Sequence, residues 1–344
     1  MCISLFGKKR SRIQLAGMFA CALLTGVMVL PAAAEQSRGI TLEPVARKTV
    51  TPFSEGTYRA LIIGNNQYRD KHGHWRPLES AVTDAKAVKN LLQNNYGFED
   101  VELIENATRR DVLLALDALS KRSMSNDNVL VYYAGHGFMD EETQKGFWIP
   151  VDAEGTDQST FLRNSTIRDE LTTIAARVKH TLLVSDSCFS GSLLRSTTRG
   201  MTPVADSESY YKKVAEKKSV QIMTAGGVEY VDDNYKTSGH SPFTYFLLSE
   251  LKNNDKPMLT VSELSNSVKK AVANNVDQVP ENGVLLGAGD ELGEFIFIKL
   301  DVEVEGVPAD RVKVKVNVKQ AEPSKNKPAR SDDIKHDTIP IPTL

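Results

Sequence analysis

Two short apolar runs, each followed by a reactive side chain among small residues, constrain the fold of this chain most. The run at 180–184 (HTLLV) leads into Cys188, and the run at 128–134 (NVLVYYA) leads into His136, which stands between two glycines. Such runs, rich in β-branched and aromatic residues, predict buried strands. A thiol and an imidazole held at the ends of two core strands suit a nucleophile and its general base.

The segments around these two runs alternate between predicted strands and amphipathic helices. This alternation predicts an α/β fold with a mostly parallel sheet that helices cover on both faces. Ligands bind such sheets at the carboxyl ends of the strands, where His136 and Cys188 are both expected. The predicted strands are 58–65, 101–104, 128–134, 146–151, 180–184, 220–225 and 294–298, and the predicted helices are 78–96, 109–121, 167–177, 241–252 and 260–274.

Four motifs stand out along the chain: RALIIGN at 59–65, YAGHG at 133–137, DSCFSG at 186–191 and FTYFLL at 243–248. Together they resemble those of the caspase-like cysteine peptidases, and within them the bacterial metacaspase-like group, the orthocaspases. The animal caspase signature Q-A-C-[RQG]-G is absent, because Asp186-Ser187 stands where it has Gln-Ala. His136 lies 52 residues (188 − 136) before Cys188, close to the caspase spacing of about 50. The resemblance spans residues 57–300 and implies a caspase-like three-layer sandwich.

The resemblance implies a cysteine endopeptidase in which His136 deprotonates Cys188 and later protonates the leaving amine. It further implies that the backbone amides of Gly137 and Cys188 stabilise the oxyanion. By the same resemblance, Asp84 joins Asp186 in lining the primary pocket, where two carboxylates favour Arg or Lys over the Asp that animal caspases select. The alternatives are that Asp84 is an exposed helix position and that Asp186 is a turn-forming residue.

The segment 193–219 has little apolar periodicity and many polar residues, which predicts a long surface loop. A basic-selective pocket makes this loop a candidate substrate of its own enzyme. The candidate cleavage positions are Arg195, Arg199, Lys212, Lys213, Lys217 and Lys218.

Two other functions remain open at this stage. Caspase-like folds also occur as catalytically silent scaffolds that act by binding, although such relatives usually lose the Cys or the His. A redox or metal site at Cys188 is the third possibility, but one cysteine with scattered histidines forms no ligand cluster.

Calcium is a separate question, because some metacaspases use it. Asp152, Asp169 and Glu170 resemble part of that calcium site, whereas Arg195 stands where a further acidic residue is expected. Hard cations need several oxygen ligands, so we predict no metal and no other cofactor. The alternative role is that Asp152 ends a strand and that Asp169 and Glu170 lie near a helix N-terminus, favoured by the helix dipole.

Residues 1–34 have the pattern of a secretory signal peptide: a basic segment at 8–12, an apolar segment at 15–30 and small residues at 31–34. We therefore expect an exported, periplasmic protein with no stable membrane span after cleavage. An uncleaved membrane anchor is the alternative, and a lipoprotein site at Cys21 is a weaker one. After cleavage Cys188 is the one remaining cysteine, which in an exported protein indicates a reactive thiol.

The remaining segments flank the predicted peptidase domain at 57–300. Residues 35–56 are polar and predict an extended arm, and the alternating valines of 301–319 predict a β-hairpin. Residues 320–344 are rich in proline and charge and predict a disordered tail. The net charge of −2 gives no reason to expect nucleic acid. By the resemblance we expect a monomer that acts on proteins or peptides.

Overall fold

A computed structural model describes residues 56–188, 193, 208–226, 233–285 and 287–300. The predicted signal peptide, hairpin and tail, and the predicted arm up to residue 55, lie outside the described residues. Among the residues that are described, no helix combines the length and apolar character needed to cross a membrane.

A six-stranded sheet forms the centre of the domain, with the strand order β10-β8-β7-β3-β1-β2. All neighbouring pairs are parallel except the pair of β10 and β8 at one edge. This arrangement confirms the predicted mostly parallel sheet. The strands are β1 (Tyr58–Gly64), β2 (Asp100–Glu105), β3 (Asn128–Ala134), β7 (His180–Asp186), β8 (Ser219–Thr224) and β10 (Glu281–Val284).

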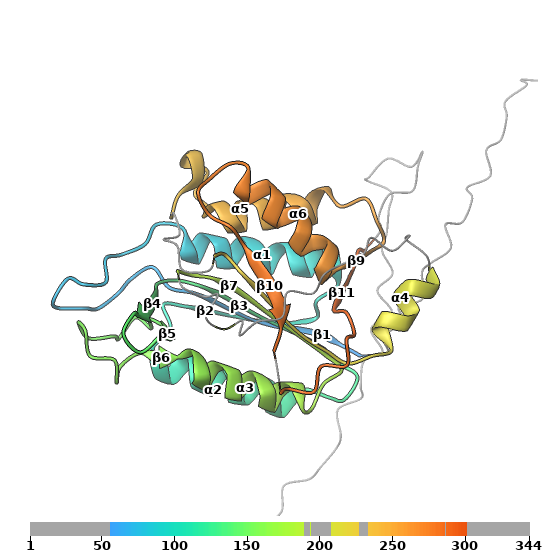
Figure 1. The fold of residues 1–344 in the computed structure, drawn as a ribbon, viewed down its shortest axis with the longest axis horizontal. Helices are drawn as coiled ribbons and strands as arrows, with labels where there is room; N and C mark the ends of the chain where they lie inside the picture. Colours follow the sequence, from blue (N-terminus) through green and yellow to red (C-terminus); the bar gives the residue numbers. More distant parts are fainter. Residues whose placement is uncertain (1–55, 189–192, 194–207, 227–232, 286, 301–344) are drawn as a thin grey trace, which may run out of the picture. The chain divides into compact units, whose positions relative to one another are not determined.

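Helices cover both faces of this sheet, as Figure 1 shows. One face packs against α1 (Ala81–Tyr96), α5 (Pro242–Asn253) and α6 (Val261–Ala273), and the other packs against α2 (Arg109–Arg122) and α3 (Asn164–Ala175). Alternate residues of each central strand point to opposite faces. In β3, for example, Tyr132 belongs to the first core and Val131 to the second. Burial on both faces explains the continuous apolar runs in the sequence.

Local sequence signals define several helix ends. Thr108 and Asp111 form a capping box at the start of α2, and Thr260 and Glu263 form another at the start of α6. Gly97 ends α1 in the left-handed conformation with φ 64°, which glycine adopts without steric cost. Helix α1 begins at residue 81, three residues later than the sequence predicts.

The structure also contains short strands that the sequence pattern predicts only in part. Strand β5 (Lys145–Trp148) overlaps the predicted strand at 146–151, but it pairs with β4 (Gly137–Asp140) and β6 (Leu162–Arg163) in a separate small sheet. A two-stranded sheet joins β9 (Met258–Thr260) to β11 (Ile296–Ile298), and β11 lies within the predicted strand at 294–298. The unpredicted strands β4, β6 and β9 are too short to show a period, so only their pairing defines them.

The prediction of an irregular loop over 193–219 is wrong for its second half. Residues Glu208–Ala215 form helix α4, and β8 begins at Ser219. Tyr211 of α4 is 4% exposed and packs with Met258 and Ile296, which come from distant parts of the chain. The helix is stabilised by tertiary packing, which local periodicity over eight residues does not reveal.

Candidate active site

His136 and Cys188 lie together because of the register of β3 and β7. Ala134 pairs with Asp186 across these parallel strands, and His136 and Cys188 each follow that pair by two residues. Both therefore leave the sheet at its carboxyl edge, and both line the same pocket. Gly137 packs against this turn so closely that a Cβ there would lie 2.0 Å from the Cys188 carbonyl oxygen, so only glycine fits without a shift of the backbone.

The His136 ring is oriented by a backbone carbonyl. Its Nε2 lies 2.8 Å from the carbonyl oxygen of Arg76, which accepts but cannot donate, so Nε2 carries the proton and Nδ1 is left as a base. The rings of Tyr68 and Trp75 flank the imidazole, with centroid separations of 4.6 and 5.7 Å. Burial lowers the pKa of His136, which favours the neutral form that a general base requires.

Asp70 organises the loop that carries Trp75 and the Arg76 carbonyl. This loop lies between the predicted strand at 58–65 and the predicted helix at 78–96, and the Asp70 side chain within it is fully buried. Burial opposes its ionisation, yet hydrogen bonds from backbone N–H groups outweigh this effect and lower the pKa of Asp70 to about 2. Its four backbone donors, at 2.6–3.1 Å, are His72, His74, Trp75 and Gly155.

Asp186 supplies a buried carboxylate to the pocket, and one of its oxygens has no partner. Its Oδ2 accepts hydrogen bonds from Ser241 Oγ at 2.5 Å and Thr244 Oγ1 at 2.6 Å. Its Oδ1 is buried without a hydrogen bond. Burial and the nearby charge of Asp84 raise the pKa of Asp186 to about 7. An unsatisfied buried oxygen is costly, and a bound donor, above all a cation, would remove that cost.

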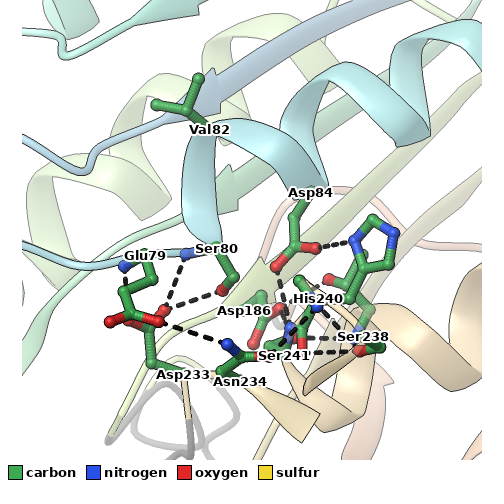
Figure 2. A network of polar contacts seen from close by, with 12 residues as sticks. Glu79, Ser80, Val82, Asp84, Asp186, Asp233, Asn234, Ser238, His240 and Ser241 are labelled. Atoms are coloured by element: carbon green, nitrogen blue, oxygen red, sulfur yellow. Dashed lines mark hydrogen bonds and ion pairs between the residues drawn. The ribbon is translucent and has the colours of Figure 1, made fainter. Parts of the chain in front are cut away.

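Asp84 is buried as well, so the alternative of an exposed helix position is wrong. Its side chain is 1% exposed, and it lines the same pocket as Asp186. Its Oδ1 lies 2.5 Å from His240 Nδ1, and its Oδ2 accepts the backbone N–H of Ser241 at 3.2 Å. Ser241 thus contacts both carboxylates, as Figure 2 shows.

Asp233 connects the segment before α5 to the start of α1. Its carboxylate accepts the backbone N–H groups of Glu79 and Ser80 at 2.5 and 3.1 Å, and the Ser80 hydroxyl at 2.7 Å (Figure 2). Asp233 therefore holds the two residues that precede this helix, while it also lines the pocket. The sequence does not indicate this contact, because 153 residues separate Asp233 from Ser80.

The calcium candidates do not lie where the sequence suggests. Asp152 follows β5 by four residues, and its Oδ1 accepts the backbone N–H of Arg109 at 2.8 Å at the start of α2. Asp169 and Glu170 lie in the middle of α3 rather than at its N-terminus, so the expected dipole interaction is wrong. In the described part of the chain, no group of three or more His, Cys, Asp or Glu residues is placed to hold a metal ion.

The candidate self-cleavage positions differ in their surroundings. Lys212 and Lys213 lie within α4. The backbone N–H of Lys218 donates to Glu291 Oε2, and its carbonyl oxygen accepts N–H groups from Glu291 and Gly293. Arg195 and Arg199 lie outside the described residues.

Comparison with known proteins gives the family. A model of the caspase domain matches residues 57–284. Metacaspase-1 of Saccharomyces cerevisiae is 29% identical over 161 residues, which cover 40% of this chain and 34% of the relative. Metacaspase-7 of Arabidopsis thaliana is 29% identical over 153 residues, with coverages of 40% and 35%. The chain thus spans about a third of the length of these curated relatives.

Among solved structures, caspase-1 from Spodoptera frugiperda aligns with a TM-score of 0.49 and 16% identity, covering 71% of this chain and 94% of that chain. The protein GSU0716 from Geobacter sulfurreducens aligns with a TM-score of 0.47 and 19% identity, covering 70% and 99%. Since the caspase-domain model matches about two thirds of the 344 residues, the chain belongs to the caspase-domain family.

Proposed function

We propose that this protein is a cysteine endopeptidase of the orthocaspase group that cleaves after Arg or Lys. One observation carries the proposal: Cys188 and His136 line the same pocket as Asp186, whose Oδ1 is buried without a partner. A nucleophile, a base and an unsatisfied acceptor within one pocket are what cleavage after a cationic side chain requires.

The reaction follows from these positions. His136 Nδ1 takes the proton of the Cys188 thiol, and the thiolate attacks the carbonyl carbon of the scissile bond. The backbone N–H groups of Gly137 and Cys188 donate to the oxyanion that forms. The protonated His136 then gives its proton to the leaving amine as the carbon–nitrogen bond breaks. A water molecule, deprotonated by His136, hydrolyses the thioester and restores the thiol.

Substrate choice depends on the charge of the pocket. A Lys or Arg side chain would donate a charge-assisted hydrogen bond to Asp186 Oδ1 and would pair that carboxylate. An acidic side chain would instead meet two buried carboxylates, Asp84 and Asp186, and would be repelled by them. The scaffold alternative leaves the unsatisfied oxygen of Asp186 without a role.

Self-processing within residues 193–219 is part of the proposal. A peptidase binds its substrate in an extended form, which disfavours Lys212 and Lys213 in α4. Cleavage after Lys217 or Lys218 is disfavoured as well, because the N–H and the carbonyl oxygen of Lys218 are both hydrogen-bonded within the fold. We therefore expect cleavage after Arg195 or Arg199. The predicted signal at 1–34 makes the mature enzyme an exported, periplasmic protein, and we expect it to act as a monomer.

The test compares the wild-type protein with Cys188→Ala on three peptide amides that differ only in an Arg, Lys or Asp before the bond. We expect the wild type to cleave the Arg and Lys substrates and Cys188→Ala to cleave none. Mass spectrometry of the purified proteins should find fragments that end at Arg195 or Arg199 in the wild type alone. Absence of cleavage by the wild type would favour the scaffold, and preferred cleavage after Asp would refute the basic pocket.

A further inference from the structure

His240 contacts a pocket carboxylate from outside the pocket. Its ring is 23% exposed and lines a separate groove between α1 and α5, with Ala87, Tyr245 and Lys252 among its neighbours there. Its Nδ1 lies 2.5 Å from Asp84 Oδ1 (Figure 2). The hydrogen bond to Asp84 raises the pKa of His240, and burial opposes the rise less strongly. The contact with Asp84 therefore favours the protonated form of the imidazole.

The two pocket carboxylates consequently differ in what they offer a ligand. Both oxygens of Asp84 are engaged, one by His240 and the other by the Ser241 N–H. Asp186 has one engaged oxygen and one unpartnered oxygen. The charge of Asp84 is balanced from within the protein, whereas the charge of Asp186 is not.

We propose that His240 is a specificity-determining positioning residue: it pairs with Asp84, so that Asp186 alone meets the cation of the substrate. This inference rests on the proposed basic-selective peptidase. With His240 protonated and Asp186 neutral, the three groups Asp84, Asp186 and His240 together carry no net charge. When His240 and Asp186 lose their protons, these three groups carry two negative charges. The acceptance of a cation therefore rises with pH in two coupled steps.

Other titratable groups lie in the pocket and in the groove. Asp84, on α1, faces the His240 ring. Asp186, on β7, lines the same pocket as Asp84. Asp233 contributes a further negative charge to the pocket, and α5 adds a phenol and an ammonium group to the groove. Of these groups, Asp84 is the one in direct contact with the imidazole. The charged and titratable groups of the pocket and the groove that surround His240 are Asp84, Asp186, Asp233, Tyr245 and Lys252.

The experiment measures kcat/KM from pH 6 to 9 for two peptide amides, one with arginine and one with citrulline before the bond. Citrulline has nearly the shape of arginine without its charge, and both substrates use the same Cys188 and His136. The ratio of the two values therefore cancels the titration of the catalytic pair and reports the pocket charge. The variants are His240→Gln, which keeps a hydrogen-bond donor without a charge, and Lys252→Gln, which removes an exposed positive charge from the same groove but leaves the contact between His240 and Asp84 in place.

In the wild type and in Lys252→Gln we expect the ratio to rise by about 100-fold across this range, at about tenfold for each charge that changes. In His240→Gln it should rise by about tenfold, because one of the two steps is lost. Asp84→Asn removes the other partner of the same contact and should also reduce the rise of the ratio with pH. This second variant keeps the proposal testable if His240→Gln folds poorly. Profiles of both variants that superpose on the wild type would overturn the inference. A wild type that cleaves neither substrate would instead refute the proposed function.

Discussion

Replacing Asp186 with asparagine should stabilise the folded protein at neutral and alkaline pH while it removes cleavage after Arg and Lys. The reason is the position of this carboxylate, which is 4% exposed and has one unpartnered oxygen. An asparagine in the same place can still accept the hydroxyl groups of Ser241 and Thr244 through its carbonyl oxygen. It carries no charge, so the cost of burying an ion disappears.

The size of the effect follows from the pKa of Asp186, which burial and the charge of Asp84 raise from 3.8 to about 7. A carboxyl group with a raised pKa binds its proton more tightly in the folded state than in the unfolded state. Its penalty is therefore absent below pH 3.8, grows as the pH rises towards 7 and is complete above that value. The difference between the two pKa values corresponds to about 4 kcal/mol of unfolding free energy, as an upper bound.

The assay is urea unfolding between pH 4 and 8, with Cys188→Ala in both proteins to prevent self-cleavage. We expect the unfolding free energy of the protein with Asp186 to fall across this range relative to Asp186→Asn. The difference between the two proteins cancels titrations that they share, including that of the buried His180, whose pKa burial lowers to about 4. Parallel stability profiles would refute the reasoning. Retained cleavage after Arg by Asp186→Asn, with Cys188 restored, would refute the role of the carboxylate in specificity.

Two further predictions concern the support of the site. Asp70→Asn should lower kcat/KM for the arginine and citrulline substrates equally, by about tenfold or more. The reason is that the loop that presents the Arg76 carbonyl to His136 loses the carboxylate that holds it. A changed ratio of the two values would contradict this role. Excess EGTA should leave cleavage unchanged, since Asp152 is engaged with a backbone N–H group; a strict requirement for added calcium in the same assay would overturn that expectation.

Local pattern alone determined the central part of the fold. The predicted strand at 128–134 is the observed β3, and the predicted run at 180–184 lies within β7. Both strands are buried on two faces, so each of their residues carries the apolar signal that defines a parallel core strand. The sequence also shows that His136 and Cys188 each follow the end of a predicted strand by a few residues. Their proximity follows from the topology of an α/β sheet.

The tertiary structure decided how the pocket is built. His240 and Asp84 lie 156 residues apart, and Asp233 lies 153 residues from the serine that it contacts. Neither contact has a local sequence signal, because each depends on how the start of α1 packs against the segment before α5. Helix α4 and strand β10 likewise depend on distant partners. The sequence thus determined which reactive residues stand at the strand ends, and only the packing of distant segments determined which of the buried charges are paired.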